Sequence, residues 1–163
     1  MTIKSVIRAI ATVSVPAALT ASALSGCMDR TEKYSEFITL ENAEWPYART
    51  LVFTPDLPDS TDVGQIELVL RHTHGFRYSN IWLELSYDTS DSTVVADTLN
   101  IRLADSFGHW LGSGSGASYS ITSTIADSAA LCSGRPIRLR HIMRSDTLTG
   151  VEQVGLVFRA DTH

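Results

Sequence analysis

Two short runs of alternating apolar and polar residues, 65–71 and 81–88, constrain the fold of this chain more than any other feature. The apolar positions are Ile66, Leu68 and Leu70 in the first run and Ile81, Leu83, Leu85 and Tyr87 in the second. A period of two puts one side of each segment on a core and leaves the other side in water, as in a half-buried β-strand. The aromatic and polar segment 72–79 is then expected to be the turn between two strands.

Similar short runs recur along the rest of the chain, and no window longer than about a dozen residues keeps a helical period. The predicted strands cover residues 49–54, 65–74, 80–88, 95–104, 118–125, 136–143 and 151–159. Turn-rich stretches separate them at residues 55–64, 89–93, 108–116, 127–136 and 145–150, and residues 127–131 are expected to form one helical turn. This pattern predicts an all-β fold, an antiparallel β-sandwich of about seven to eight strands over residues 45–163.

The first 26 residues have the order of an export signal. Lys4 and Arg8 are followed by an apolar stretch that is too short and too rich in small residues for a membrane-spanning helix. The sequence Leu24-Ser25-Gly26-Cys27 then resembles the bacterial lipobox, in which the cysteine thiol is acylated and the chain is cut just before it. The alternative is an ordinary signal peptide with a chance cysteine.

Lipidation of Cys27 would have two consequences. Residues 27–44 are expected to be the acylated cysteine and a polar tether, and the added acyl chains would anchor the protein firmly in a membrane. The second cysteine, Cys132, would be left as a lone thiol, although a disulfide between the two is formally possible. A lone buried thiol usually behaves as a small apolar residue.

The charge balance excludes some partners. The 163-residue chain has a formal net charge of -5, and the first 26 residues contribute only the basic Lys4 and Arg8. The segment that follows is therefore more acidic than the whole chain. This argues against nucleic acid as a partner and against electrostatic docking on anionic lipid.

Few residues suggest chemistry. His72 and His74 would share one face of a strand and could bind a metal together with His109 or His141. No carboxylate or cysteine has a matching spacing, so surface or turn histidines are the simpler interpretation. No metal, cofactor or catalytic residue is expected. Serine, histidine and aspartate are so plentiful that a possible Ser-His-Asp combination is not evidence of a catalytic triad.

The glycine-rich segment 108–116 is not a phosphate-binding loop. Such a loop needs a helix after it, whereas a Ser/Thr-rich strand is predicted to follow. We expect a tight loop that braces Trp110, with glycines at positions of positive φ. Trp110 is expected to pack against the domain with its N–H hydrogen-bonded.

Two arginines close predicted strands next to polar turns. Arg71 leads towards Tyr78-Ser79-Asn80, and Arg144 leads towards Asp146. The guanidinium group can hold several turn carbonyls at once, so we expect both arginines to brace loops, with a partner contact as the alternative. Arg71 and Asn80 are expected to hydrogen-bond the backbone of the 72–79 turn.

Four stretches in a fixed order carry a family resemblance. They are Arg71 with Tyr78-Ser79-Asn80-Ile81-Trp82-Leu83, Asp105 with Gly108-His109-Trp110-Leu111-Gly112, Met143-Arg144 with Asp146-Thr147-Leu148-Thr149-Gly150, and Val151-Glu152-Gln153-Val154-Gly155-Leu156. With the lipobox, they resemble the gliding-motility lipoproteins of the GldH family of Bacteroidetes. Arg77 departs from the family pattern, which has a proline there.

The resemblance implies an envelope lipoprotein associated with the machinery for surface gliding, which overlaps with a secretion system that delivers adhesins. Expected partners are the membrane, through the lipid anchor, and envelope proteins, with the outer membrane facing the periplasm as the location. The family also occurs in bacteria that do not glide. It has no assigned catalytic residues.

Three function classes remain. The first is a non-enzymatic interaction module. The second is a carbohydrate-binding lipoprotein, in which Trp82, Trp110, Tyr78 and Tyr119 stack on sugars. Trp82 lies on the polar side of its strand and is expected to be exposed, but no planar row of aromatic residues is visible. The third is an enzyme, for which a catalytic constellation is lacking.

Overall fold

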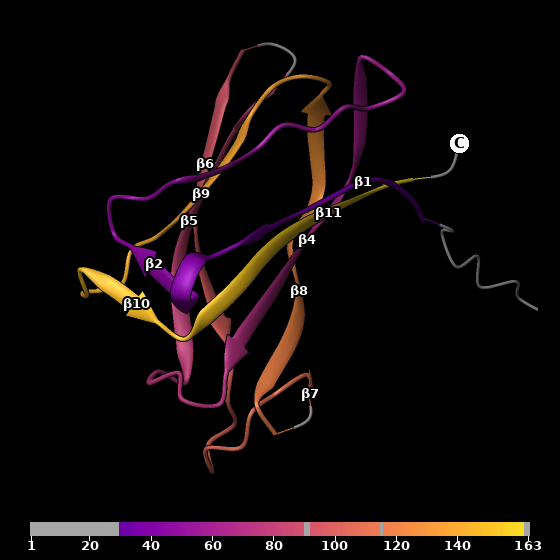
Figure 1. The fold of residues 1–163 in the computed structure, drawn as a ribbon. Coiled ribbons are helices and arrows are strands. Elements are labelled where there is room, and N and C mark those ends of the chain that lie inside the picture. Colours follow the sequence, from indigo (N-terminus) through magenta and orange to yellow (C-terminus); the bar gives the residue numbers. More distant parts are fainter. Residues whose placement is uncertain (1–29, 90–91, 115, 162–163) are drawn as a thin grey trace, which may run out of the picture.

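A computed structural model describes residues 30–89, 92–114 and 116–161, which form a β-sandwich (Figure 1). The strands are β1 (Arg30–Thr39), β2 (Glu44–Pro46), β3 (Leu51–Phe53), β4 (Thr61–Thr73), β5 (Asn80–Asp88), β6 (Val94–Arg102), β7 (Ser113–Gly114), β8 (Ser118–Cys132), β9 (Ile137–His141), β10 (Thr147–Thr149) and β11 (Val151–Asp161), with one 3₁₀ turn, η1 (Glu41–Ala43). The predicted signal peptide and Cys27 lie outside the described residues. Within these residues no helix is long and apolar enough to span a membrane.

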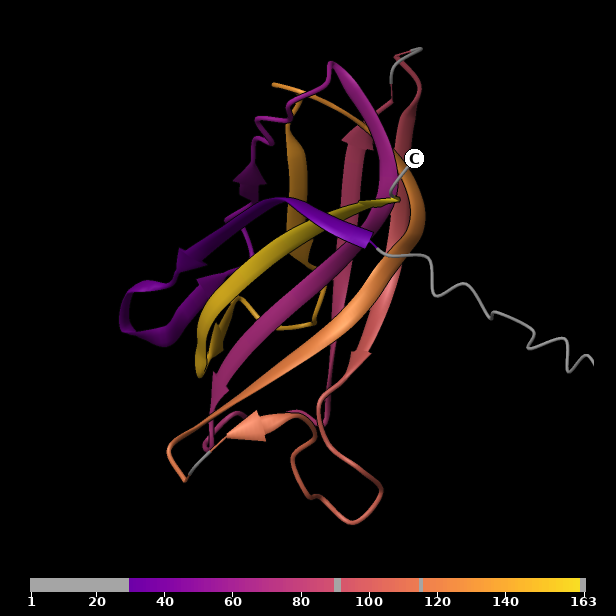
Figure 2. The same cartoon turned by 90° about the vertical axis from the view of Figure 1, so that its right-hand side faces the viewer.

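The strands form two main layers (Figures 1 and 2). A five-stranded sheet has the order β1-β11-β4-β8-β7, and a four-stranded sheet has the order β3-β9-β5-β6. A small two-stranded sheet of β2 and β10 lies at one side. All strand pairs are antiparallel. The predicted antiparallel sandwich is therefore confirmed.

The core follows the alternation in the sequence. Along β5 every second side chain from Ile81 to Tyr87 is buried, and along β4 the same holds from Ile66 to His72. Apart from His72, the two sets belong to one hydrophobic cluster. Full burial of each large aliphatic side chain stabilises the fold by about 1.5–3 kcal/mol. The runs that constrain the fold most are thus the centre of the two facing sheets.

The tether predicted for residues 27–44 is wrong from Arg30 onward. Strand β1 pairs with β11 along the edge of the five-stranded sheet, so the domain begins before residue 45. Tyr34 and Ile38 pack against the core, while Phe37 lies on the opposite face. Because apolar residues occupy both faces, β1 has no clean period of two and resembles a polar linker in the sequence.

The helical turn predicted for residues 127–131 is also wrong, because β8 continues to Cys132 as a strand. Strand β4 begins earlier than predicted, and its first residues supply the hydrogen-bonding partner for this half of β8. On the other side of β4, Gly64 lets β11 approach closely, since a Cβ there would lie 2.2 Å from the Arg159 carbonyl oxygen. Two register shifts near Ile66 absorb the mismatch between the two long strands.

Cys132 is a free thiol at the end of β8 and is buried. Its Sγ lies 3.8 Å from the Thr61 hydroxyl oxygen. This agrees with the prediction that the side chain fills space as a small apolar group.

Candidate interaction surface

The residues singled out from the sequence do not form one site. Arg71 lies on the outer face of the five-stranded sheet, and Asn80 and Trp82 lie on the outer face of the four-stranded sheet. Tyr78 and Trp110 lie at one end of the sandwich, where the loops meet. Arg144 and Asp146 lie in the loop that follows β9, residues 142–146, which we call the Arg144 loop.

Backbone hydrogen bonds hold the 72–79 turn. The Thr73 N–H donates to the Gly150 carbonyl (2.8 Å), and the His74 N–H donates to the Ala117 carbonyl (2.9 Å). These bonds tie the turn to the start of β11 and to the segment before β8. The turn is therefore fixed by the chain segments around it.

The predicted bracing of this turn by Arg71 and Asn80 is wrong. The Arg71 Nε donates to the Glu152 carboxylate at 3.0 Å, and the Asn80 amide donates to the Asn100 side-chain oxygen at 2.7 Å. Both partners lie on neighbouring strands, because strand alternation directs these two side chains to the outer faces of the sheets. Neither side chain reaches the turn backbone.

A cluster of rings lies behind the turn. The ring of the fully buried His72 is 4.5 Å from that of Trp110, 5.6 Å from that of Phe76 and 6.0 Å from that of Tyr119, measured between centroids. Its Nδ1 lies 2.9 Å from the Thr73 carbonyl oxygen, so Nδ1 carries the proton and donates. Burial lowers the pKa of His72. The imidazole is therefore neutral and acts as a packing group.

Trp110 packs against the core from the glycine-rich loop, as predicted. Its backbone pairs with Ala104, but among the described residues its indole N–H has no hydrogen-bond partner, so that part of the prediction is wrong. Gly112 has φ of +86°, and a Cβ there would lie 2.2 Å from the Ser120 carbonyl oxygen. Glycine is required at this position for the loop to fold back on β8.

Tyr78, another residue singled out from the sequence, packs edge-on against Phe76.

The four histidines considered as metal ligands do not form one cluster. His74 is exposed, His109 lies 3.1 Å from the Asp105 carboxylate in its own turn, and His141 is buried beneath other side chains. Across residues 30–89, 92–114 and 116–161, no group of three or more His, Cys, Asp or Glu is placed to hold a metal.

Trp82 is 41% exposed on the outer face of the four-stranded sheet, as its place in the alternation predicts. Its carbonyl accepts a hydrogen bond from the Ile142 N–H (2.9 Å), and its N–H donates to the Met143 sulfur (3.3 Å). The sulfur thus takes the place of a ladder carbonyl where β9 leaves the sheet. These two bonds tie the Arg144 loop to Trp82.

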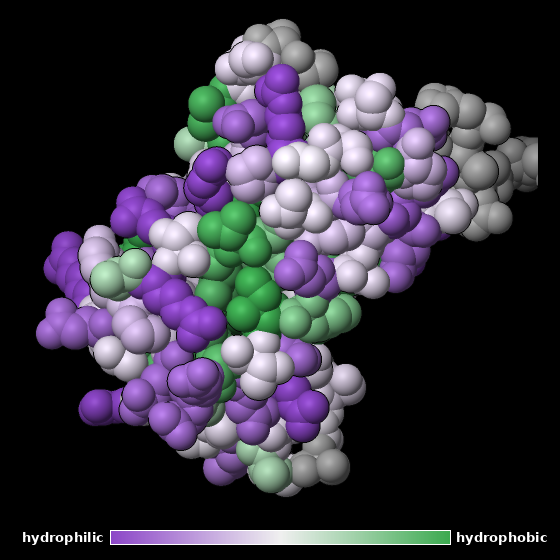
Figure 3. Space-filling view, turned by 45° about the horizontal axis from the view of Figure 1, so that its top comes forward, coloured by the Kyte–Doolittle hydropathy of each residue, from purple (hydrophilic) through white to green (hydrophobic). Residues whose placement is uncertain are grey.

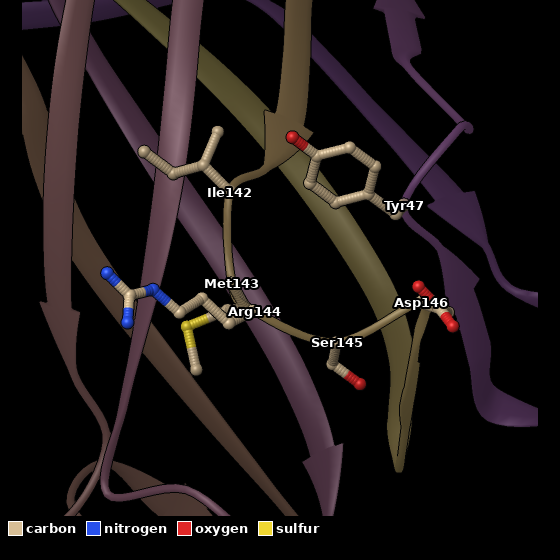
Figure 4. A pocket seen from close by; sticks show the side chains of 6 residues that line it. All are labelled: Tyr47, Ile142, Met143, Arg144, Ser145 and Asp146. Atoms are coloured by element: carbon tan, nitrogen blue, oxygen red, sulfur yellow. The ribbon is translucent and has the colours of Figure 1, made fainter.

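The Arg144 loop borders a shallow pocket of about 280 Å³ (Figure 4). Its lining residues are Tyr47, Ile142, Met143, Arg144, Ser145 and Asp146. In Figure 4 the Arg144 guanidinium and the Asp146 carboxylate point to opposite sides of the loop, so they do not pair. The loop is held by its backbone instead: the Tyr47 N–H donates to the Asp146 carbonyl (2.8 Å).

Tyr47 is 46% exposed, and its ring packs on a buried aromatic ring. The buried ring of His141 contacts the rings of Tyr47 and Trp45, each at 5.5 Å. The His141 Nε2 lies 3.0 Å from the Trp45 carbonyl oxygen, and burial lowers the pKa of His141. Tyr47 was not predicted from the sequence as a surface residue, and Met143 was named only as part of a family stretch. The available signal was weak, an aromatic residue directly after Pro46 in a turn.

Charges on this sheet are only partly balanced. The Arg140 guanidinium bonds both oxygens of Glu84, at 2.7 and 2.9 Å, and lowers the pKa of that carboxyl. Arg138 lies beside this pair, and Arg144 extends from the adjoining loop. Within the part of the chain that the structure describes, neither Arg138 nor Arg144 forms an ion pair. We use the name four-stranded face for the surface formed by Tyr47, Trp82, Arg138 and the Arg144 loop.

Apolar side chains are also exposed elsewhere. Phe37, Val52 and Val63 are each between 43% and 47% exposed. Figure 3 shows one side of the molecule, where apolar side chains gather in a central strip with hydrophilic side chains around it. The surface is thus not uniformly polar.

Comparison with protein families gives a match over residues 32–158 to the family described as GldH lipoprotein. The chain belongs to this family. A curated relative, "Gliding motility lipoprotein GldH homolog" of Christiangramia forsetii, is 32% identical over 92 residues, which cover 56% of this chain and 55% of the relative. The match thus spans about half the length of that relative. Membership of a lipoprotein family indicates a membrane-anchored place in the cell envelope.

Similarity to solved structures is low. The Eiger TNF of S. frugiperda has a TM-score of 0.36 and 12% identity, with 82% of this chain and 92% of that chain covered. The module described as CBM35 from Cellvibrio japonicus Abf62 has a TM-score of 0.36 and 13% identity, with 79% and 99% covered. Neither similarity carries an argument about function.

Proposed function

We propose that this GldH-family protein is a non-enzymatic component of envelope machinery for surface gliding or the associated protein secretion, and that it binds its protein partner through the four-stranded face. The family match and the printed name of the relative, a gliding motility lipoprotein, support the cellular role. The proposed anchor is lipidated Cys27 at the outer membrane, with the domain in the periplasm. The histidines support a non-enzymatic role, because His72 and His141 pack within ring clusters and His109 braces a turn.

One observation carries the choice of surface. Tyr47, an exposed ring, lines the pocket together with Met143 and Arg144, and a second exposed ring, Trp82, is joined to the same loop through hydrogen bonds of its backbone. Tryptophan, tyrosine and arginine are the residue types that dominate binding energy in protein interfaces, and methionine is enriched there. Trp82, Tyr47 and Arg144 are exposed, and Met143 is partly buried against the core, so three of the four side chains are open to a partner.

The position of the anchor agrees with this choice. Strand β1 begins three residues after Cys27, so the start of β1 lies within about 10 Å of the acylated residue. In Figures 1 and 2 this end of β1 and the β2–β10 pair lie on opposite sides of the molecule. Tyr47 follows β2 and the Arg144 loop precedes β10. The pocket is therefore on the side away from the anchor, where an envelope protein can reach it.

A complementation experiment tests the proposal. The gene is deleted in the source strain and replaced by the parent, by a Trp82→Ala/Arg144→Glu double variant, or by Val63→Ala, a matched exposed position on the other sheet. Surface spreading, delivery of surface adhesins and the level of the protein are measured. We expect deletion to abolish spreading or adhesin delivery, the double variant to do so at normal protein level, and Val63→Ala to behave as the parent. Normal spreading and adhesin delivery in the deletion strain would contradict the proposed role.

A further inference from the structure

A groove crosses the outer face of the five-stranded sheet, on the layer opposite the four-stranded face. It consists of two adjoining hollows of about 300 and 220 Å³, which share Arg71 and Gln153. The larger hollow is also lined by Phe37, Val69, Tyr119 and Ser120. The smaller hollow adds Thr39 and Glu152. The groove therefore has both aromatic and polar walls.

Phe37 provides an apolar platform in this groove. It is paired across the strands with Gly155, and a Cβ at Gly155 would lie 2.3 Å from the Phe37 Cδ1 and 2.4 Å from its Cε1. The ring therefore rests directly on the glycine backbone, yet Phe37 is 46% exposed. An aromatic ring supported from below in this way offers its other side to a ligand.

Polar groups surround the platform. Arg71 uses its Nε for Glu152 at 3.0 Å and has no other hydrogen-bond partner in the described part of the chain, so both terminal amino groups are available. The Gln153 amide nitrogen donates to the Thr39 hydroxyl at 3.3 Å, and the amide oxygen remains an acceptor. Among the described residues the Ser120 hydroxyl has no hydrogen-bond partner. The groove thus presents the Arg71 guanidinium, the Gln153 amide and the Ser120 hydroxyl as hydrogen-bond donors and acceptors for a ligand.

We propose that this groove binds a glycan. A pyranose ring has a face of C–H groups that packs on the negative face of an aromatic ring, and Phe37 supplies such a face. Its vicinal hydroxyls need paired donors and acceptors, which Arg71, Gln153 and Ser120 supply. Because the two hollows adjoin at Arg71 and Gln153, the ligand is an oligosaccharide chain rather than a single sugar. Trp82 and Trp110, considered for this role from the sequence, do not line the groove; Tyr119 does.

The test is calorimetric titration of the full-length chain in detergent micelles with three defined probes: cellohexaose, chitohexaose and hexagalacturonate. We expect saturable binding of at least one. Phe37→Ala should weaken it about tenfold, the loss expected when ring stacking of about 1.4 kcal/mol is removed. Phe37→Tyr keeps the ring and should bind as the parent does. Val52→Ala, at an exposed position on the other sheet, should also bind as the parent does.

A second variant guards against misfolding of Phe37→Ala. Arg71→Met removes the guanidinium group but only a largely exposed ion pair, so the fold is retained. It should also weaken binding. Absence of saturable binding to all three probes would overturn the proposal, as would parental affinity in either Phe37→Ala or Arg71→Met. The protein-binding role of the four-stranded face is measured separately and survives either result.

Discussion

Arg71 and Arg159 on the outer face of the five-stranded sheet pair with carboxylates on neighbouring strands, whereas Arg138 and Arg144 on the four-stranded face form no ion pair within the described residues. Arg159 lies between Glu32 (3.3 Å) and Glu67 (3.1 Å) and bridges three neighbouring strands. On the other layer Arg138 and Arg144 have no ion-pair partner among the described residues. The first arrangement serves the fold. Side chains that serve no contact within the domain are the better candidates for contact with a partner.

The aromatic residues extend the comparison. Trp45 is fully buried, its N–H donates to the Arg49 carbonyl at 2.9 Å, and it supports the ring of His141 from below. Trp82 lies on the neighbouring four-stranded sheet and faces outward. One tryptophan therefore stabilises the domain, and the other is available for binding.

The largest expected effect separates these two tryptophans. Trp45→Ala should cost about 3–5 kcal/mol in the free energy of unfolding, because it empties a buried site. Trp82→Ala should cost less than about 1 kcal/mol, as expected for an exposed position. Urea melts of the full-length chain in detergent measure both. Equal losses of stability in the two variants would show that Trp82 stabilises the core as Trp45 does. The two tryptophans would then not differ in role.

Each main sheet buries one histidine, which predicts a pH dependence of stability. Burial lowers the pKa of both His72 and His141, so the unfolded chain binds more protons than the folded chain at acidic pH. Their contribution is complete above the unfolded pKa of about 6.5 and decreases as the pH falls below that value.

Urea midpoints of the parent and of His72→Phe, measured near pH 7.5 and near pH 5, test this prediction. The parent should lose stability towards pH 5, and His72→Phe should lose less because the ring cluster no longer has a group to protonate. An identical acid loss in the two proteins would show that His72 does not titrate with unfolding.

A smaller effect distinguishes the two sets of arginines. Arg159→Ala breaks a network of two ion pairs and should cost about 1 kcal/mol. Arg138→Ala removes an exposed group without such a partner and should change stability by less than about 0.5 kcal/mol. Thermal melts at low salt compare them. A larger loss for Arg138→Ala would reverse the assignment of the two faces.

Small effects are also expected at Arg71 and Asn80. Their partners, Glu152 and Asn100, are reached across the exposed outer faces, so each alanine variant should lose less than about 1 kcal/mol. Adding salt should reduce the Arg71 effect and leave the Asn80 effect unchanged. A loss of several kcal/mol in either variant would indicate that the 72–79 turn depends on these side chains after all.

Local alternation was sufficient to predict the central strands. Strand β5 covers residues 80–88 in both the prediction and the structure, because each buried side chain is followed by a polar one. Strand β1 was missed because Phe37 occupies the outer face while Tyr34 and Ile38 occupy the inner face. The second half of β8 was missed because its small residues are extended only by pairing with β4.

The site was harder to predict for a similar reason. The exposure of Trp82 follows from its own strand and was predicted correctly. The exposure of Phe37 depends on Gly155 in another strand, and the position of Tyr47 depends on His141 beneath it. The roles assigned to Arg71 and Asn80 were wrong because the nearest polar group in the sequence, the 72–79 turn, is not the nearest in space.

Site-specific photo-crosslinking in living cells tests the central claim most directly. A benzophenone amino acid replaces Trp82 or Tyr47 on the four-stranded face, or Val69 or Thr122 on the outer face of the five-stranded sheet, at equal protein levels. After irradiation, adducts with other proteins are counted on blots and identified by mass spectrometry. The account predicts that Trp82 and Tyr47 give one shared protein adduct that Val69 and Thr122 do not give. Adducts formed equally from both faces, or only from Val69 and Thr122, would contradict it.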